Sequence, residues 1–167
     1  NVRGRDIGSF VKDAQAAMAE ERRYRAWLQW MAERQGQAAR RAAGVRVLGD
    51  LPFMISGDSP DVWSRREQFM LDATVGVPPD AFSATGQLWG NPIYRWEYMA
   101  KRGFDWWLER LGVTLQRFDA VRLDHFIAFR RYWEIPAGST DARVGRFVHV
   151  PGEALFERAR EVFGGLP

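Results

Sequence analysis

The sequence predicts an α/β fold in which short buried strands alternate with helices and form a parallel sheet. Residues 45–48 and 120–123 have the length and the apolar composition of buried strands. Helical periodicity precedes both stretches and returns after the second. Strands that alternate with helices form parallel sheets with right-handed crossovers, and these sheets carry their reactive groups at the C-terminal ends of the strands.

The first predicted element is helical and covers residues 10–43. This stretch is rich in Ala, Glu, Arg and Gln, and its apolar residues recur at helical intervals. We expect one or two helices with a break near Gly36. Arg40 and Arg41 place cations at the negative end of the helix dipole, and Gly44 is suited to end the helix.

A strand-end site at residues 45–50 and a long substrate loop at residues 51–92 follow. Asp50 is expected directly after the strand, at its C-terminal end. The loop contains five of the eight prolines, and residues 61–70 are its one helical candidate. A stretch of this length without periodicity is usually functional when it is ordered.

Residues 93–118 are predicted to form two helices separated at Gly103. Asn91 is suited to cap the first helix and Pro92 to occupy its first turn. The remaining predicted elements are a strand segment at 119–126, a further strand at 132–135 and a C-terminal helix at 153–163.

The composition excludes several classes of protein. A chain of 167 residues with 46% hydrophobic residues can form a core, and the absence of Cys excludes thiol chemistry and fits a reducing cytoplasm. No apolar run reaches the roughly 18 residues that span a bilayer. A net charge of +3 does not favour nucleic acid. We therefore expect a cytoplasmic protein without membrane or nucleic-acid partners.

Aromatic residues are more frequent than a core of this size requires. The chain has eight Trp, and 14% of its residues are aromatic. Flat rings stack on sugar faces and on nucleobases, so an aromatic nucleic-acid-binding module is an alternative to a sugar-binding protein. Core packing is expected to account for about half of the rings.

The segment FDAVRLDHF, residues 118–126, combines charged residues with an apolar strand. Arg122 and Asp124 are two residues apart, so both side chains leave the same face of an extended backbone. A guanidinium favours the ionised carboxylate, which is suited to act as a nucleophile or metal ligand and not as a general acid. A structural ion pair, with His125 as an ordinary loop histidine, explains the segment equally well.

Residues 75–94 form a second group of interest. Asp80 and Asn91 offer hydrogen bonds close to the rings of Phe82 and Trp89. Polar groups beside flat rings suit the hydroxyl edge and the apolar face of a sugar, although a stacked base or a loop that packs its own aromatics fits as well.

Other types of site find no support. The sequence has no dinucleotide or phosphate-loop motif and no esterase motif, and its two histidines do not suffice for a multi-histidine zinc site. The spacing of its aspartates matches no calcium or magnesium loop, so no metal is expected.

Five motifs together resemble the 4-alpha-glucanotransferases known as amylomaltases or disproportionating enzymes. The resemblance runs from about Trp27 to the C-terminus. It implies an α/β fold that is an incomplete part of a (β/α)8 TIM barrel of the alpha-amylase type, transfer of alpha-1,4-glucan segments between maltooligosaccharides with retention, and no cofactor. The motifs are GDLPF (49–53), DSPDVW (58–63), GVPPDAFSATGQLWGNPIYRW (76–96), VRLDHF (121–126) and YWEIPA (132–137).

The resemblance also implies roles for single residues. Asp124 matches the nucleophile that forms the glycosyl-enzyme, Arg122 the arginine that orients it, and His125 a histidine that contacts the donor sugar. Asp50 matches an aspartate at the end of an earlier barrel strand, which supports the site.

The loop that begins at Asp80 matches a mobile loop over the glucan subsites. The resemblance places Asp80, Trp89 and Asn91 among the substrate-binding residues. Many relatives have Tyr where this chain has Ala81, which puts one contact from this loop in doubt.

A retaining glycosidase needs a second carboxylate about 5 to 5.5 Å from the nucleophile as its acid and base. In the family this glutamate lies in an AEDLG-like motif shortly after the equivalent of Pro167. Residues 1–167 are therefore expected to be a single partial segment of the catalytic barrel that is inactive by itself. A non-catalytic carbohydrate-binding fragment is the alternative, and open sheet edges are expected to favour self-association.

Overall fold

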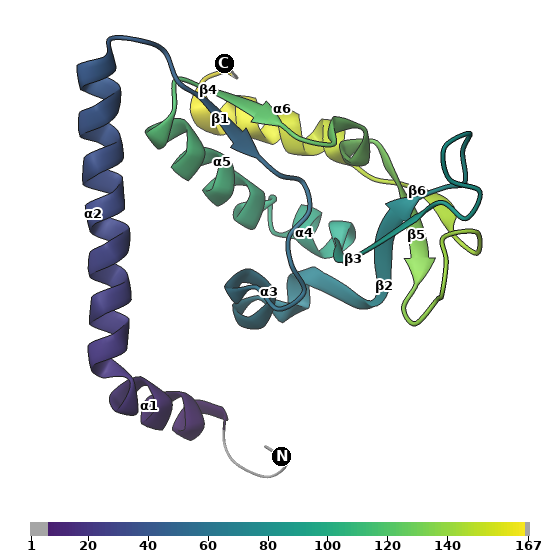
Figure 1. The fold of residues 1–167 in the computed structure, drawn as a ribbon, viewed down its shortest axis with the longest axis horizontal. Coiled ribbons are helices and arrows are strands. Elements are labelled where there is room, and N and C mark those ends of the chain that lie inside the picture. Colours follow the sequence, from purple (N-terminus) through teal and green to yellow (C-terminus); the bar gives the residue numbers. More distant parts are fainter. Residues whose placement is uncertain (1–6, 166–167) are drawn as a thin grey trace. The chain divides into compact units, whose positions relative to one another are not determined.

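The computed structural model describes residues 7–165 and shows a mixed α/β fold (Figure 1). The chain divides into two compact units, Asn1–Val47 and Leu48–Pro167. The first unit is helical in its described part, whereas the second contains both sheets and all of the predicted site residues.

The helical unit consists of α1 (Ile7–Ala17) and α2 (Ala19–Ala43). Gly44 ends α2 in the left-handed conformation, with φ of 62°, and so confirms the predicted end of this helix. The expected break near Gly36 is wrong, because the interruption lies at Met18 and Gly36 is inside α2. A glycine inside a helix costs only about 1 kcal/mol relative to Ala, which good helix formers on both sides can offset.

The second unit contains the remaining elements in a mixed order. Helices α4, α5 and α6 account for most of its helical residues, and 3₁₀ turns η1 and η2 adjoin two of its strands. The elements are β1 (Leu48–Leu51), α3 (Pro60–Ser64), η1 (Arg66–Gln68), β2 (Phe69–Val77), β3 (Gln87–Tyr94), α4 (Trp96–Lys101), α5 (Asp105–Arg117), β4 (Ala120–Leu123), η2 (Phe126–Phe129), β5 (Arg131–Pro136), β6 (Arg146–His149) and α6 (Gly152–Phe163).

Strands β1 and β4 form the predicted parallel pair, in which Asp50 is opposite Arg122. The predicted strand at 120–123 is confirmed, but the earlier strand begins at Leu48 and not at residue 45. Asp50 therefore lies within β1 and not after it. A Cβ added at Gly49 would overlap the Phe118 ring, so a larger residue does not fit at this position of β1.

The predicted long loop at 51–92 is wrong in part, because it contains β2 and most of β3. These strands belong to a four-stranded antiparallel sheet with the order β3-β2-β5-β6, which the predicted parallel architecture did not include. Asn91 and Pro92 lie in β3, so they do not begin a helix. The predicted strand at 132–135 lies within β5.

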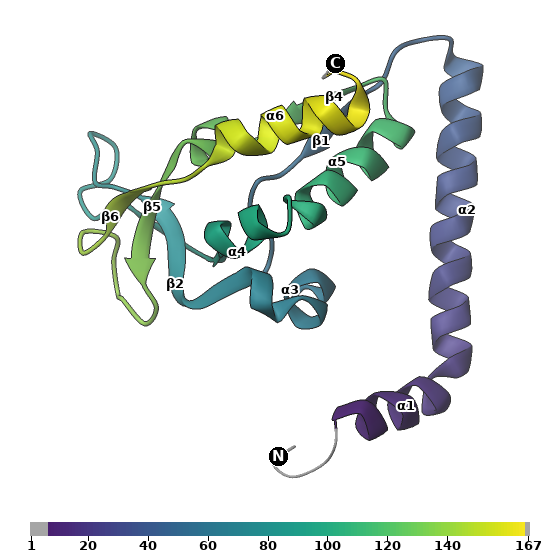
Figure 2. The ribbon, with the colours of Figure 1, turned by 180° about the vertical axis from the view of Figure 1, so that it is seen from behind.

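Helices after β3 follow the prediction more closely. Gly103, with φ of 64°, separates α4 from α5, and α6 ends before Gly164 as expected. Figures 1 and 2 show α5 and α6 side by side along the β1–β4 pair. The helices therefore cover one face of this pair. The charged residues Arg122 and Asp124 lie at the C-terminal end of β4.

Aromatic rings form the centre of the core in the second unit. Phe53, Tyr94, Trp107 and Phe129 are almost fully buried, and the ring of Phe53 contacts the other three at centroid distances of 4.8 to 5.7 Å. Since Phe53 follows β1 closely, the core reaches the end of the strand pair. Three of the eight Trp are buried, which accounts for part of the aromatic surplus in the sequence.

Candidate functional site

One guanidinium lies between two carboxylates at the end of the β1–β4 pair. Arg122 Nη2 donates a hydrogen bond to Asp124 Oδ1, and Arg122 Nε lies 3.6 Å from Asp50 Oδ1. The parallel register explains the arrangement, because it sets Asp50 beside Arg122 while the alternation of the strand puts Asp124 on the same face as Arg122.

All three side chains of this group are accessible to solvent. Their exposed fractions are 59% for Asp50, 57% for Arg122 and 48% for Asp124. Ion pairs this exposed contribute about 0 to 1 kcal/mol to stability. A purely structural ion pair therefore explains little, and the accessible carboxylate of Asp124 can be reached by a ligand.

The backbone fixes where the strand ends. The Asp124 N–H donates a hydrogen bond to the Leu51 carbonyl oxygen at 3.1 Å, and His125 follows in the left-handed conformation with φ of 50° and ψ of 48°. A positive φ is uncommon for a residue with a side chain, and strained residues of this kind cluster at functional sites. The turn directs the chain into η2 and separates the His125 side chain from those of the strand.

The imidazole of His125 lies among aromatic rings. Its centroid is 5.0 Å from that of Trp89, with 72° between the planes, and 6.5 Å from that of Phe53. Burial lowers the pKa of His125 below its ordinary value of 6.5, although the Asp124 carboxylate raises it in part. The structure thus favours a neutral imidazole, which can both donate and accept a hydrogen bond.

Trp89 brings the β2–β3 hairpin to this group. Its indole Nε1 donates a hydrogen bond to Gln87 Oε1 at 2.9 Å, and the residue is 37% exposed. The ring is therefore anchored at one edge and accessible at another. Trp89 and His125 together form an aromatic wall beside the charged group.

The two other predicted residues of this region serve the backbone. Asp80 Oδ1 accepts hydrogen bonds from the N–H groups of Phe82 and Ser83, both at 2.8 Å, and so shapes the loop between β2 and β3. Asn91 Nδ2 donates to the Ile55 carbonyl oxygen at 2.8 Å. The structure therefore gathers Asp50, Arg122, Asp124, His125 and Trp89, and gives Asp80 and Asn91 positions that shape nearby loops.

Sequence reasoning missed three residues that contact His125 or the backbone after β1 and so support the charged group. Phe53 contacts His125 through its ring, and the Tyr94 hydroxyl and the Arg110 guanidinium bond the backbone that follows β1. Phe53 and Tyr94 belong to two of the five family motifs, GDLPF and the motif at 76–96, so the motifs could have identified them. Arg110 gave no such signal, because it lies outside these motifs and its helix, α5, is an ordinary amphipathic helix.

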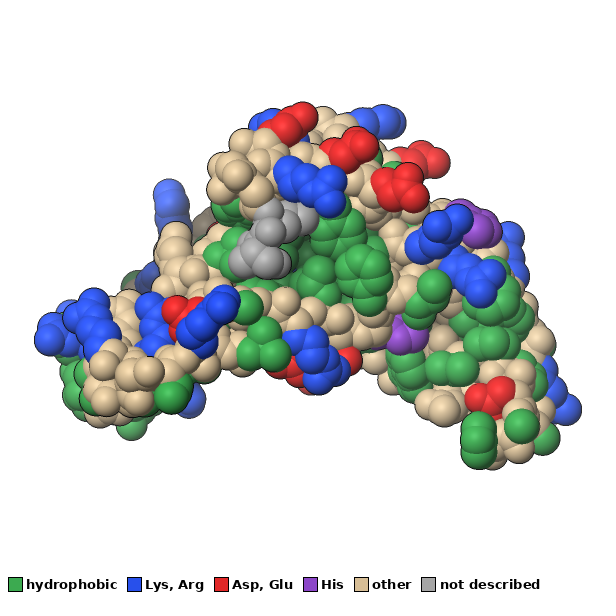
Figure 3. Space-filling model, turned by 90° about the horizontal axis from the view of Figure 1, so that it is seen from above, with side chains coloured by type: hydrophobic (Ala, Val, Ile, Leu, Met, Phe, Trp, Pro, Cys, Tyr) green, Lys and Arg blue, Asp and Glu red, His purple; other side chains and the backbone are tan. Residues whose placement is uncertain are grey.

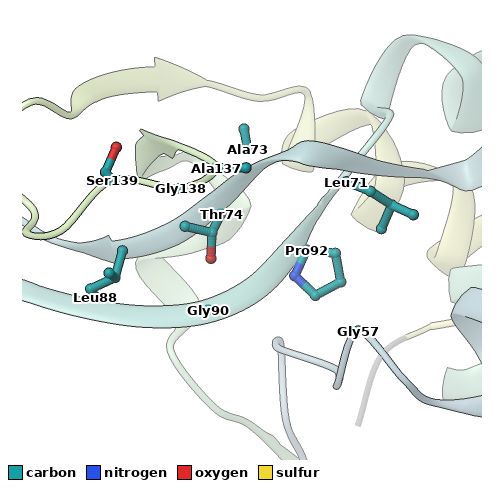
Figure 4. A pocket seen from close by; sticks show the side chains of 10 residues that line it. All are labelled: Gly57, Leu71, Ala73, Thr74, Leu88, Gly90, Pro92, Ala137, Gly138 and Ser139. Carbon is teal, nitrogen blue, oxygen red and sulfur yellow. The ribbon is translucent and has the colours of Figure 1, made fainter.

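A separate pocket of about 310 Å³ lies beside the antiparallel sheet (Figure 4). Its lining comes from β2, β3, Gly57 and the turn after β5, and it includes Leu71, Leu88 and Pro92. Thr74 and Ser139 supply its only side-chain hydroxyls, and none of its lining residues is titratable. The pocket can accept an apolar surface but has no group for acid–base chemistry.

Other types of site were sought in the described part of the chain. Residues 7–165 contain no group of three or more His, Cys, Asp or Glu side chains that could hold a metal ion. None of the described helices is long and apolar enough to cross a membrane. On the face seen in Figure 3 many hydrophobic side chains lie together, and Lys, Arg, Asp and Glu side chains lie mainly around them.

Comparisons with known proteins agree on one family. The family model described as 4-alpha-glucanotransferase matches residues 3–167. A 4-alpha-glucanotransferase from Thermus thermophilus is 45% identical over 166 residues, which are 94% of this chain and 33% of the relative. One from Aquifex aeolicus is 44% identical over 153 residues, 86% of this chain and 32% of the relative. The chain thus spans about a third of these relatives.

A solved structure is similar over nearly the whole chain. The amylomaltase from Streptococcus agalactiae in complex with acarbose superposes with a TM-score of 0.92 and 36% identity, over 98% of this chain and 35% of that one. The amylomaltase from Corynebacterium glutamicum has a TM-score of 0.74 and 26% identity, over 83% of this chain and 21% of that one.

Proposed function

This chain belongs to the 4-alpha-glucanotransferase family, and we propose that the protein it forms part of transfers alpha-1,4-glucan segments between maltooligosaccharides. The observation that carries the proposal is the accessible carboxylate of Asp124, bonded to Arg122 at the end of a parallel strand. We assign Leu48–Pro167 to an incomplete (β/α)8 barrel of the alpha-amylase type. The parallel β1–β4 pair, with α5 and α6 along it, supports this assignment.

The proposed reaction has two displacements at the same carbon. Asp124 attacks the anomeric carbon of the donor glucan, so that a bond forms to its carboxylate oxygen and the glycosidic bond breaks. The leaving oxygen takes a proton from a general acid. A hydroxyl of the acceptor sugar then displaces Asp124 and gives its proton to the conjugate base of that acid, which restores the enzyme with the original configuration at carbon.

Arg122 has two tasks in this scheme. Its guanidinium fixes the orientation of Asp124, and its positive charge lies beside the carboxylate that makes the attack. Asp50 faces the same guanidinium at 3.6 Å and supports the site electrostatically. We therefore assign the proton donor to neither described aspartate but to the glutamate that the family resemblance places after residue 167.

Substrate contacts are assigned to the aromatic wall and to the adjoining loop. The neutral imidazole of His125 is suited to bond a hydroxyl of the donor sugar, and Trp89 to pack against a sugar face. Asn91 and Asp80 complete the proposed binding set, mainly by shaping the loops around it. The proposal includes no cofactor, and a cytoplasmic location remains a prediction from the sequence without Cys.

Incubation of the complete protein with maltotriose tests the function. We expect glucose together with a ladder of longer glucans, because each transfer lengthens one chain and shortens another. In Asp124→Asn the ladder is expected to disappear, since an amide is a poor nucleophile at this carbon. An inactive wild-type protein, or an Asp124→Asn variant with undiminished activity, would contradict the assignment.

Residues 1–167 alone allow a second measurement. Without a suitable acid at the site they are expected to bind maltooligosaccharides weakly and not to turn them over. Calorimetry measures the binding, and sugar analysis after incubation measures turnover. Formation of longer glucans by this segment would show that one of its own carboxylates serves as the acid.

A further inference from the structure

The segment that leaves β1, residues 51–55, is held through its backbone oxygens. Four of its carbonyl groups accept hydrogen bonds from donors that come from other parts of the chain. The pairs are the Asp124 N–H with Leu51 (3.1 Å), Arg110 Nη2 with Pro52 (3.1 Å), the Tyr94 hydroxyl with Phe53, and Asn91 Nδ2 with Ile55 (2.8 Å).

Arg110 occupies an unusual place for a cation. Its guanidinium carbon lies 4.7 Å from the ring centroid of Trp106 and 4.9 Å from that of Trp107, in the aromatic core. Burial lowers the pKa of Arg110, but an arginine in a protein remains charged. Its Nη1 is buried and has no hydrogen-bond partner in residues 7–165, so the charge has been only partly compensated.

Tyr94 complements this cation. Burial raises the pKa of Tyr94, with the nearby charge of Arg110 opposing the rise, so that its hydroxyl remains a donor at all ordinary pH values. The donor binds the Phe53 oxygen. Arg110 and Tyr94 therefore hold two consecutive carbonyl groups just after the strand that carries Asp50.

Stability alone does not explain a partly buried arginine at this position. Replacement of buried ionic groups by apolar residues of similar volume is often neutral or stabilising. An arginine donates a directed hydrogen bond, which an apolar side chain does not. What the guanidinium adds is a fixed position for the Pro52 carbonyl group.

We propose that Arg110 and Tyr94 are positioning residues for Asp124 and His125 and act through residues 51–53. Leu51 accepts the hydrogen bond of the Asp124 N–H, and the ring of Phe53 contacts that of His125. A shift of this segment moves the proposed nucleophile and its neighbouring histidine together. The inference rests on the proposed function and adds to it two residues that do not touch the reacting atoms.

Kinetics of the complete protein on maltotriose test the proposal. Arg110→Met and Tyr94→Phe are each expected to lower kcat about 10- to 100-fold with KM nearly unchanged, because a misplacement of about 1 Å suffices for such a loss. Arg110→Lys keeps a charged donor and is expected to recover part of the loss. Arg158→Met is the matched control, since Arg158 is half-exposed on α6 and pairs with Glu161.

Amide hydrogen exchange gives a readout that does not depend on activity. In both variants the Asp124 amide is expected to exchange about tenfold faster, while the amides shared by β2 and β5 keep their rates. A folded Arg110→Met protein with unchanged kcat and unchanged exchange at Asp124 would overturn the proposal. If Arg110→Met does not fold, Tyr94→Phe decides by the same criteria.

Failure of the proposed function leads to a different result. A wild-type protein that forms no glucan ladder rejects the transferase, whatever the variants do. The amide hydrogen exchange rate of Asp124 in the variants then shows by itself whether Arg110 and Tyr94 hold the segment after β1 in place.

Discussion

The two sheets of the second unit differ in what they bury. The β1–β4 pair has Leu48 63% exposed at its start, and no residue of β4 is fully buried. The antiparallel sheet buries Val75, Ile93 and Ile135, each with at most 1% of its surface exposed. The less buried sheet carries the charged group, so changes at the proposed site should affect activity and changes in the antiparallel sheet should affect stability.

The largest effect is expected from a substitution that adds one carbon to the antiparallel sheet. In Gly76→Ala the new Cβ would overlap the Gln87 carbonyl oxygen of β3 and the Ile135 side chain of β5. Overpacking of this kind costs about 1 to 3 kcal/mol or more, and we expect about 3 kcal/mol because backbone is involved. Thermal or urea unfolding measures the loss.

Gly57→Ala is the matched control for this change. Its new Cβ would have Pro92 Cδ at 3.9 Å as its nearest neighbour, which is ordinary contact. Equal stability of the two variants would show that the antiparallel sheet adapts freely, and the contrast between the sheets would not hold.

The opposite outcome is expected for Arg122→Met on the parallel pair. The ion pairs of Arg122 are exposed, so stability should change by less than about 1 kcal/mol. Glucan transfer by the complete protein should fall about 10- to 100-fold, because Asp124 loses the group that orients it. Initial rates with maltotriose measure this loss. Arg143→Met, at another exposed ion pair, is expected to retain activity.

A smaller effect is expected from Trp89→Ala. Removal of the ring takes away one face for a sugar, worth about 1 kcal/mol, so that KM for maltotriose should rise about fivefold with little change in kcat. Trp63→Ala serves as the control, because Trp63 is 73% exposed and belongs to α3. A drop in kcat without a change in KM would assign Trp89 to the reaction itself and not to binding.

The smallest effect concerns the dependence of stability on pH. Burial lowers the pKa of His125 in the folded protein, so the unfolded chain binds more protons at mildly acidic pH. The contribution of His125 to stability is therefore complete above about pH 6.5 and is lost as the pH falls through the lower, folded value. Melting temperatures at pH 7.5 and 5 measure the change.

His125→Gln removes this group and should flatten the profile between these pH values. A profile that stays as steep in His125→Gln would assign the dependence to other groups.

Local sequence patterns predicted elements that depend on near neighbours. Gly44, Gly103 and Gly164 end or interrupt helices as expected, because a glycine adopts the left-handed conformation without steric cost. The β2–β3 hairpin was missed for the converse reason. Its strands contain Gly and Pro, which have low strand propensity. The pairing of β2 with β3 and with β5 compensates for this, and it cannot be read from the local sequence.

The proposed site divides in the same way. The spacing in VRLDHF was sufficient to place Arg122 beside Asp124, since alternate residues of a strand share a face. It could not show that Asp50 shares the guanidinium, which depends on the register of β1 against β4. Nor could it identify Arg110, whose hydrogen bond to the Pro52 carbonyl oxygen depends on the packing of α5 against the segment that follows β1.

The sequence by itself therefore determined the chemistry available to this protein: an arginine beside a carboxylate and a histidine at the end of a strand, within motifs of one family. Tertiary structure alone decided which distant groups meet them, namely Asp50 through strand register, Trp89 through the hairpin, and Arg110 through helix packing. The physical reason is the distance along the chain over which each effect acts. Strand alternation relates residues two positions apart, whereas strand register and helix packing depend on every element that shares the core.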